Sequence, residues 1–375
     1  MLVVCIVLFG QTSYGANTNE ILNNQKESFG ISDFIKEVDK YKGEFFENTD
    51  IEEMLTDAIS GKIDNSKIYN KILNILGTEI RTSIKSLISV LVIVIIHSIL
   101  KSITDDLENK SISQIIYFVE YILIVTVIMS NFLEIIDLVK ETSQNLVGFI
   151  NVLMPLLITL MVYTGSIVTS NLIQPIILFL INFIGNMIEN VLIPLVLVIT
   201  VLVIVSKISE RVQIDKIAKF LKTSILWFLG IILTLFVGVV SLEGTLGSSI
   251  DGITTKTAKA AVSSLIPVVG KILGDTVDTV LGCGVILKNA IGIVGVIVII
   301  GICILPIIKI GVFSTIYSLA TVAIQPIGDE KIVKLLEEMS GIFKILFGIL
   351  CALSVMLIIG VALVIKISNS GMMYK

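Results

Sequence analysis

The sequence returns repeatedly, between residues 80 and 366, to apolar runs that are long enough to cross a lipid bilayer. A helix needs about 20 mainly apolar residues to cross the hydrocarbon core, because each residue rises about 1.5 Å and every backbone polar group must be paired within the segment. Several windows of this chain meet that requirement. The sequence therefore predicts an all-α polytopic membrane protein whose main partner is the lipid bilayer.

Composition supports this class and excludes others. The mean hydropathy is +0.99, and 15% of the residues are charged, against about 25% in an ordinary soluble domain. The net charge is −4, and Arg81 and Arg211 are the only arginines among 27 basic residues. Because no basic block is present, we expect no nucleic-acid partner.

The sequence contains no recognisable catalytic or metal-binding motif. It has no GxxxxGK phosphate loop, no HExxH pair, and no Ser or Cys with a plausible His partner. The four cysteines stand singly in apolar surroundings, which is typical of packing residues rather than metal ligands: Cys5, Cys283, Cys303 and Cys351. We therefore expect no enzyme activity, no catalytic residue, no metal and no cofactor.

The amino-terminal region divides into two parts. Residues 1–16 combine a short apolar run with small residues, which predicts a secretory signal peptide, although the basic n-region is missing. An uncleaved anchor helix is the alternative. Residues 17–82 are polar with apolar residues at helical spacing, and Thr49-Asp50-Ile51-Glu52 and Gly61 predict the start and stop of one helix. We expect this extracytoplasmic segment to dock on the membrane domain or on a partner.

Residues 83–366 are predicted to form the transmembrane bundle. The central estimate is nine spans, with seven or eight as alternatives: 83–100, 115–136, 146–163, 167–184, 191–206, 223–242, 290–308, 310–327 and 342–365. The densest basic cluster lies after the fifth of these spans and comprises Lys207, Arg211, Lys216, Lys219 and Lys222. The positive-inside rule places this cluster in the cytoplasm, together with the tail, residues 367–375.

Two stretches suggest an internal repeat. Pro155 is followed at nine residues by Thr164 and at twenty by Pro175, and Pro306 is followed at the same offsets by Thr315 and Pro326. Transporter folds often contain repeats whose proline-broken helices line the transport site. The sequence therefore predicts broken helices at Pro155, Pro175, Pro306 and Pro326. The alternative is that each proline merely kinks an ordinary span.

A polar cluster lies near the fourth predicted span. Asn182, Asn186, Glu189 and Asn190 follow i, i+4, i+7, i+8 spacing and would share one helical face. The predicted boundaries put Glu189 in the turn after that span. A substrate or ion contact is one interpretation of the cluster, and hydrogen bonding between helices or a wet turn is the other.

Residues 243–289 are half apolar and rich in glycine, which is too polar for a lipid-facing span and too apolar for a free loop. We expect an amphipathic or re-entrant element on the outer side, in which Pro267 ends a helix and Gly270 and Gly274 allow close helix approach. A plain extracytoplasmic loop is the alternative.

The same region carries a family resemblance. Ile266-Pro267-Val268-Val269-Gly270, then Gly282, and Leu287-Lys288-Asn289-Ala290 leading into Gly292 and Gly295 resemble the signature region of the stage III sporulation protein AE family. The predicted signal, exported helices and many spans also resemble that family. The resemblance singles out Pro267, Gly270, Gly274, Lys288, Asn289 and Gly292 as the candidate functional segment.

This resemblance implies a role in endospore formation. Proteins of this family lie in the mother-cell membrane around the forespore and belong to a secretion-like channel or feeding-tube complex. The implied partners are other stage III membrane and ring proteins, a separate cytoplasmic ATPase and a forespore-side channel protein. The resemblance leaves two roles open, a subunit that forms or gates a transport path and a non-conducting scaffold. A secondary transporter unrelated to sporulation is a third alternative.

Overall fold

The computed structural model describes residues 31–41, 51–60, several positions from 77 to 99, and 110–208, 214–265, 269–326 and 328–370. Across these residues the backbone is helical or forms turns, and none of them lies in a strand. The all-α class is thus confirmed for the described part of the chain. The predicted signal peptide and Pro267 lie outside the described residues.

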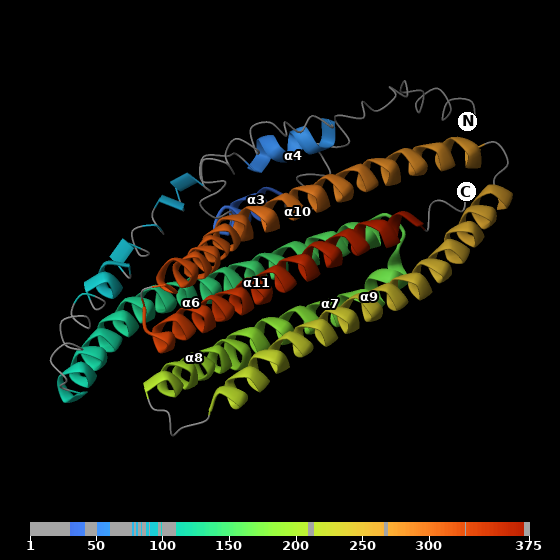
Figure 1. Ribbon diagram of the computed structural model, residues 1–375. Coiled ribbons are helices and arrows are strands. Elements are labelled where there is room, and N and C mark those ends of the chain that lie inside the picture. The colour runs from blue at the N-terminus through green and yellow to red at the C-terminus, as the bar shows by residue number, and fades with distance from the viewer. Residues whose placement is uncertain are drawn as a thin grey trace, which may run out of the picture.

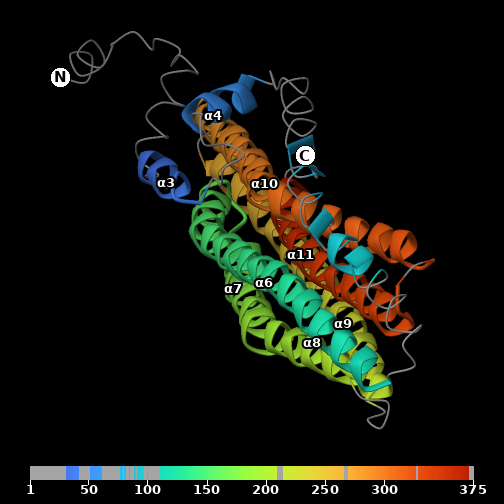
Figure 2. The same ribbon diagram turned by 60° about the vertical axis from the view of Figure 1, so that its left-hand side comes forward.

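Five long helical rods form the bundle (Figure 1). They are α6 (Lys110–Tyr163), the continuous rod of α7 (Ile167–Met187), the π-helical turn η2 (Ile188–Leu192) and α8 (Ile193–Ile208), then α9 (Asp215–Leu265), α10 (Val269–Ile324) and α11 (Glu330–Ser370). α10 packs mainly against α11 and α6, and α9 packs mainly against α11 and α7. α6 and α9 therefore lie on opposite sides of the bundle (Figures 1 and 2).

Each rod includes a segment that is long and apolar enough to cross a membrane. Among the described residues there are five such segments: Tyr117–Tyr163, Ile167–Ile208, Asp215–Leu242, Leu281–Ile324 and Glu330–Lys366. The predicted count of seven to nine spans is not confirmed, because three predicted pairs of spans are each one continuous helix. Polar residues separate the apolar runs of each pair, but polar side chains on an exposed helix face do not by themselves end a helix.

The rods are longer than a bilayer requires. The α7–η2–α8 rod contains 42 apolar-rich residues, which correspond to about 63 Å of helix. The hydrocarbon core is only about 30 Å thick. Parts of the bundle therefore extend beyond the hydrocarbon layer, even if the rods are tilted.

The predicted repeat and its broken helices are not found. Pro155 and Pro306 lie inside the continuous helices α6 and α10, and Pro175 lies inside α7, whereas Pro326 lies in the turn that follows α10. The chain turns nine residues after Pro155, at Thr164, whereas nine residues after Pro306 it is still within α10. Because the two stretches have different backbone paths, the equal proline spacing does not reflect a structural repeat. Neighbouring helices in a bundle can accommodate a proline within a rod.

The glycine-rich segment is helical, and the predicted re-entrant element is not confirmed. α9 continues to Leu265 and α10 begins at Val269, so residues 243–265 and 269–289 extend the two rods rather than form a re-entrant element. Figure 1 shows both extensions reaching past the α6–α7 turn. α9 ends two residues before Pro267, where the proline was expected to stop a helix.

Two short helices from the amino-terminal region lie against the bundle. α3 (Ile31–Val38) packs on α6, and α4 (Ile51–Ser60) packs on α10 (Figure 2). α4 begins two residues after Thr49, the first residue of the predicted capping box, and ends one residue before the predicted stop at Gly61. Ile31, Val38 and Ile51 are almost fully buried, so these helices are stabilised by apolar contact with the membrane domain.

Close approach between α7 and α9 depends on a small residue. A Cβ atom added at Gly247 would lie 2.7 Å from Cα of Thr169, a backbone atom that cannot move independently of α7. Thr169 and the neighbouring Ser170 are both completely buried. The two helices therefore pack backbone to backbone at this level, as small residues allow in membrane bundles.

We predict that Gly247→Ala lowers the free energy of unfolding by about 1–3 kcal/mol, because it overpacks this contact. Gly348→Ala in α11 is the matched control, since a Cβ atom there meets nothing within 4 Å and alanine favours the helix by up to about 1 kcal/mol. Both variants are heated in detergent, and the fraction of protein that still elutes as a monodisperse peak on gel filtration gives the unfolding midpoint. Equal unfolding midpoints for the two variants would contradict the close approach.

Candidate functional site

Polar side chains form a ladder between α6 and the α7–η2 rod, in the middle of otherwise apolar helices. Asn151 and Asn182 exchange two hydrogen bonds, with N–O distances of 3.1 and 3.0 Å. Gln144 donates to a carboxylate oxygen of Glu189 at 2.6 Å, and the Lys140 ammonium lies 3.6 Å from the same carboxylate. Hydrogen bonds of this kind join membrane helices side to side.

The structure brings the four predicted residues of the polar cluster to one side of this rod. Asn182 bonds to α6, Asn186 accepts a hydrogen bond from Asn190 at 2.6 Å, and Glu189 is the acceptor for Gln144. The predicted turn at Glu189 is wrong, because this residue lies in the π-helical turn η2 within a continuous rod. π-Helical turns insert one extra residue and are frequent at functional positions.

The ladder continues across the outer face of α6 to α10. Glu134 of α6 pairs with Lys309 of α10 at 2.7 Å, and Asp137 and Glu141 are exposed between this pair and the ladder. We call the whole set the polar band: Glu134, Asp137, Lys140, Glu141, Gln144, Asn182, Asn186, Glu189, Asn190 and Lys309. The sequence predicts only part of this band, because residues 137–145 fall between the predicted spans 115–136 and 146–163.

The polar band is level with an apolar surface on the opposite side of the bundle. Three contacts show that Lys222 of α9 and Asn131 of α6 lie at about the same height in the bundle. They link α9 to α11, α11 to α10, and α10 to α6: Lys222–Glu338, Ser340–Ser314 and Asn131–Tyr317. From this height α6 and α9 run in the same direction. Their far ends are also aligned, because Asp251 of α9 contacts the first turn of α7, which directly follows α6. Lys140 lies nine residues beyond Asn131, about 14 Å along the axis.

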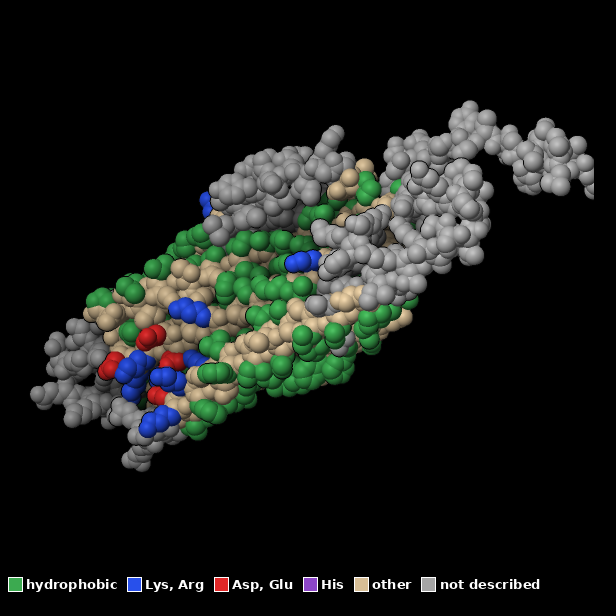
Figure 3. Space-filling view, turned by 90° about the vertical axis from the view of Figure 1, so that its right-hand side faces the viewer, with side chains coloured by type: hydrophobic (Ala, Val, Ile, Leu, Met, Phe, Trp, Pro, Cys, Tyr) green, Lys and Arg blue, Asp and Glu red, His purple; other side chains and the backbone are tan. Residues whose placement is uncertain are grey.

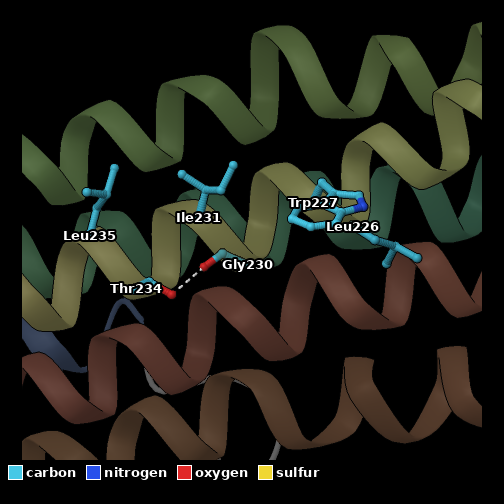
Figure 4. Close-up of a pocket in the computed structure, with 6 residues that line it drawn as sticks. All are labelled: Leu226, Trp227, Gly230, Ile231, Thr234 and Leu235. Carbon is cyan, nitrogen blue, oxygen red and sulfur yellow. Dashed lines mark hydrogen bonds between the residues drawn. The ribbon is translucent and has the colours of Figure 1, made fainter.

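At this level the outer face of α9 is suited to lipid. Trp227 is 70% exposed and Leu235 is 58% exposed. A groove of about 560 Å³ on this helix is lined by apolar side chains around Gly230 and Thr234. Figure 4 shows these lining residues, among which the Thr234 hydroxyl donates to the Gly230 carbonyl at 2.8 Å. The α9 face thus exposes hydrocarbon where the α6 face exposes charge.

Charged residues mark one end of the bundle. Figure 3 shows a face on which lysine and acidic side chains gather at one end, with hydrophobic side chains over much of the remainder. Lys207 pairs with Asp215 at 3.0 Å across the α8–α9 connection, and Lys222 of α9 pairs with Glu338 of α11. Lys216 and Lys219 are exposed on the first turns of α9, and Arg211 of the predicted basic cluster lies outside the described residues.

The start of α7 is capped by a side chain from another helix. The N-cap residue Ser166 makes no side-chain cap bond, but the buried carboxylate of Asp251 in α9 accepts hydrogen bonds from the backbone N–H groups of Val168 and Thr169 at 2.8 and 3.0 Å. A helix N-terminus leaves such donors without intrahelical partners and attracts negative charge. Sequence reasoning missed this role, although Gly244, Gly247 and Asp251 recur at helical spacing.

The candidate functional segment divides into two parts in the structure. Gly270 and Gly274 are helical residues in the first turns of α10. Lys288 is completely buried, Asn289 is half-buried, and a Cβ atom added at Gly292 would overlap the side chain of Ile365 in α11. Lys288 and Gly292 therefore belong to the tightly packed interior, and the structure separates them from the exposed polar band.

We predict that Asp251→Ala lowers the free energy of unfolding by about 1–3 kcal/mol, because it leaves two N–H groups of α7 without acceptors. Glu337→Ala is the control, since Glu337 is an exposed carboxylate on α11. Hydrogen exchange of a peptide covering residues 166–170, measured by mass spectrometry, should accelerate in the first variant alone. Unchanged protection in Asp251→Ala would show that the cap does not hold the start of α7.

The five long apolar rods and the polar band define a polytopic helical membrane protein. The family profile described as Stage III sporulation protein AE matches residues 49–368, and the chain belongs to this family. The chain is 31% identical to the Stage III sporulation protein AE of Bacillus subtilis (strain 168) over 268 residues, which are 72% of this chain and 67% of that protein. No solved structure matches the chain. The resemblance noted in the sequence is thereby confirmed.

Proposed function

We propose that this protein forms or gates a transport path within the channel complex that joins mother cell and forespore during sporulation. Membership of the sporulation family supports the biological setting. The observation that carries the path itself is the polar band, which faces outward at a level where α9 exposes Trp227 and Leu235 to lipid.

The argument rests on the energy of placing polar groups in hydrocarbon. A charged side chain at the centre of a membrane helix costs about 2.5–3.5 kcal/mol relative to water. The ion pairs Lys140–Glu189 and Glu134–Lys309 offset part of this cost. Asp137 and Glu141 are exposed beside them, and Lys140 and Glu189 still retain 48% and 32% of their side-chain exposure. Lipid is therefore an unfavourable neighbour for this face. A water-filled space would hydrate the same groups at no such cost.

The proposed complex also accounts for the charged end. In this proposal Lys216 and Lys219 face the cytoplasm of the mother cell, in accord with the positive-inside rule, and lie where a separate ATPase and ring proteins approach. α3 and α4 then lie on the extracytoplasmic portion, towards the forespore-side channel protein. The protein resides in the mother-cell membrane that surrounds the forespore.

A non-conducting scaffold is the second candidate function. Its support is the same charged end, because the exposed lysines beside the Lys222–Glu338 pair offer a docking surface that needs no path through the bundle. A secondary transporter outside sporulation would require the family match to be unrelated to its role. The two main candidates differ in one measurable property, which is conduction.

We predict that vesicles containing only this protein release a small charged dye, and that Asp137→Leu/Glu141→Leu slows the release several-fold and lowers the yield of mature spores. Both side chains are exposed, so their replacement by leucine should change the polarity of the path more than the fold. Dye release and spore counts in a strain carrying each variant measure the effect.

Glu337→Leu is the matched control, since it makes the same kind of change at the charged end. It should leave dye release unchanged. No release from vesicles of the unaltered protein at any gradient would contradict conduction by this protein alone and favour the scaffold. Equal release by the double variant and the unaltered protein would remove the polar band from the path.

A further inference from the structure

A single bundle leaves the polar band open on one side. α6 contacts α10, α11 and the α7–η2–α8 rod on its inner sides, whereas Asp137 and Glu141 are exposed on its outer side. A path needs a wall on every side that faces hydrocarbon. Since the described part of this chain supplies one wall, we infer that the remaining walls come from another surface that tolerates polar groups.

The adjoining part of α6 also carries a solvated surface. A Cβ atom at Gly148 would lie 2.8 Å from the ring of Tyr41, which follows α3, so α3 is seated close to the level of the band. The outward side chains of α3 are charged, and Asp33 and Lys36 are 86% and 78% exposed. Two independent sets of charged residues thus mark the α3–α6 side of the bundle as one that does not face lipid.

We propose that copies of this chain associate along their α6 sides, so that the polar bands form a shared contact that encloses a water-filled space. The inference rests on the proposed function, because it treats the band as the wall of the path. Homo-oligomers with closed symmetry are the commonest assemblies, and in a two-fold contact the same patch on each copy must complement itself.

The charge pattern of the band satisfies that condition. Lys140 lies one helical turn from Asp137 and next to Glu141, and both carboxylates are exposed, so a copy related by symmetry can present one of them to each Lys140. The amide groups of Gln144 and Asn186 can both donate and accept hydrogen bonds. Opposite charges and amides on one patch give complementarity between identical surfaces and hinder contact with an apolar one.

The alternative contact surface is the outer face of α9. Gly230, Thr234 and Gly238 are exposed at four-residue spacing, and small residues at this spacing allow close contact between membrane helices. However, lipid can cover this apolar face without cost, so it does not require a protein neighbour. The helices α6 and α9, which carry these two faces, lie on opposite sides of the bundle (Figures 1 and 2), so single cysteines can probe each face separately.

The test uses single cysteines in the full-length chain, with the four native cysteines replaced by alanine or serine. Glu141→Cys on α6 and Asn186→Cys on α7 sample the polar band, and Trp227→Cys and Leu235→Cys are matched controls on α9, since all four positions are exposed. Membranes are treated with a bismaleimide whose spacer bridges a narrow aqueous gap. Dimers are counted on denaturing gels.

We expect several-fold more crosslinked dimer at Glu141→Cys and Asn186→Cys than at the two α9 positions. Dimers at α9 alone, equal yields at both faces, or no dimer at any position would each overturn the inference. Dye release separates it from the proposed function: crosslinked polar bands without release would uphold the assembly and contradict conduction. Dye release without crosslinks at the polar band would support conduction and contradict the assembly.

Discussion

The organisation of this protein depends on the cost of exposing polar groups to hydrocarbon. On α9 the outer face exposes the apolar side chains of Trp227 and Leu235, whereas on α6 the outer face at the same level carries charges and amides. No single surrounding medium suits both faces. A bundle with this asymmetry must have lipid on one side and water or protein on the other, and that requirement connects the fold to the proposed path.

The same constraint explains how the rods are joined at their ends. At the start of α7, two backbone N–H groups receive the carboxylate of Asp251 from α9. At the opposite end of the bundle, Tyr121 donates to the Ile204 carbonyl of α8 at 2.5 Å, and Lys207 pairs with Asp215. These contacts hold helices together without relying on apolar burial, which provides little discrimination between neighbours when lipid is equally apolar.

The sequence predicted the helical membrane class, the family, the limits of α4 and the end of α9, because hydropathy, capping residues and Pro267 act locally. It did not predict the number of rods, since Asp137–Gln144 read as a link between spans although exposed polar residues can continue a helix. The proline spacing suggested a repeat that tertiary packing does not produce. Asp251 was missed because its partner, the start of α7, is 83 residues away and close only in the folded bundle.

The π-helical turn Ile188–Leu192 has a consequence for how α6 and its antiparallel neighbour stay in contact. Two straight helices drift apart in phase, because 3.6 residues per turn does not match a regular repeat of contact residues. The extra residue of the π-helical turn rotates the following side chains about the helix axis, halfway along the rod, so that they face α6 again. Asn182 before the turn and Ile204 after it both form hydrogen bonds with α6. The π-helical turn therefore lets α6 and the α7–η2–α8 rod stay in contact along most of their length.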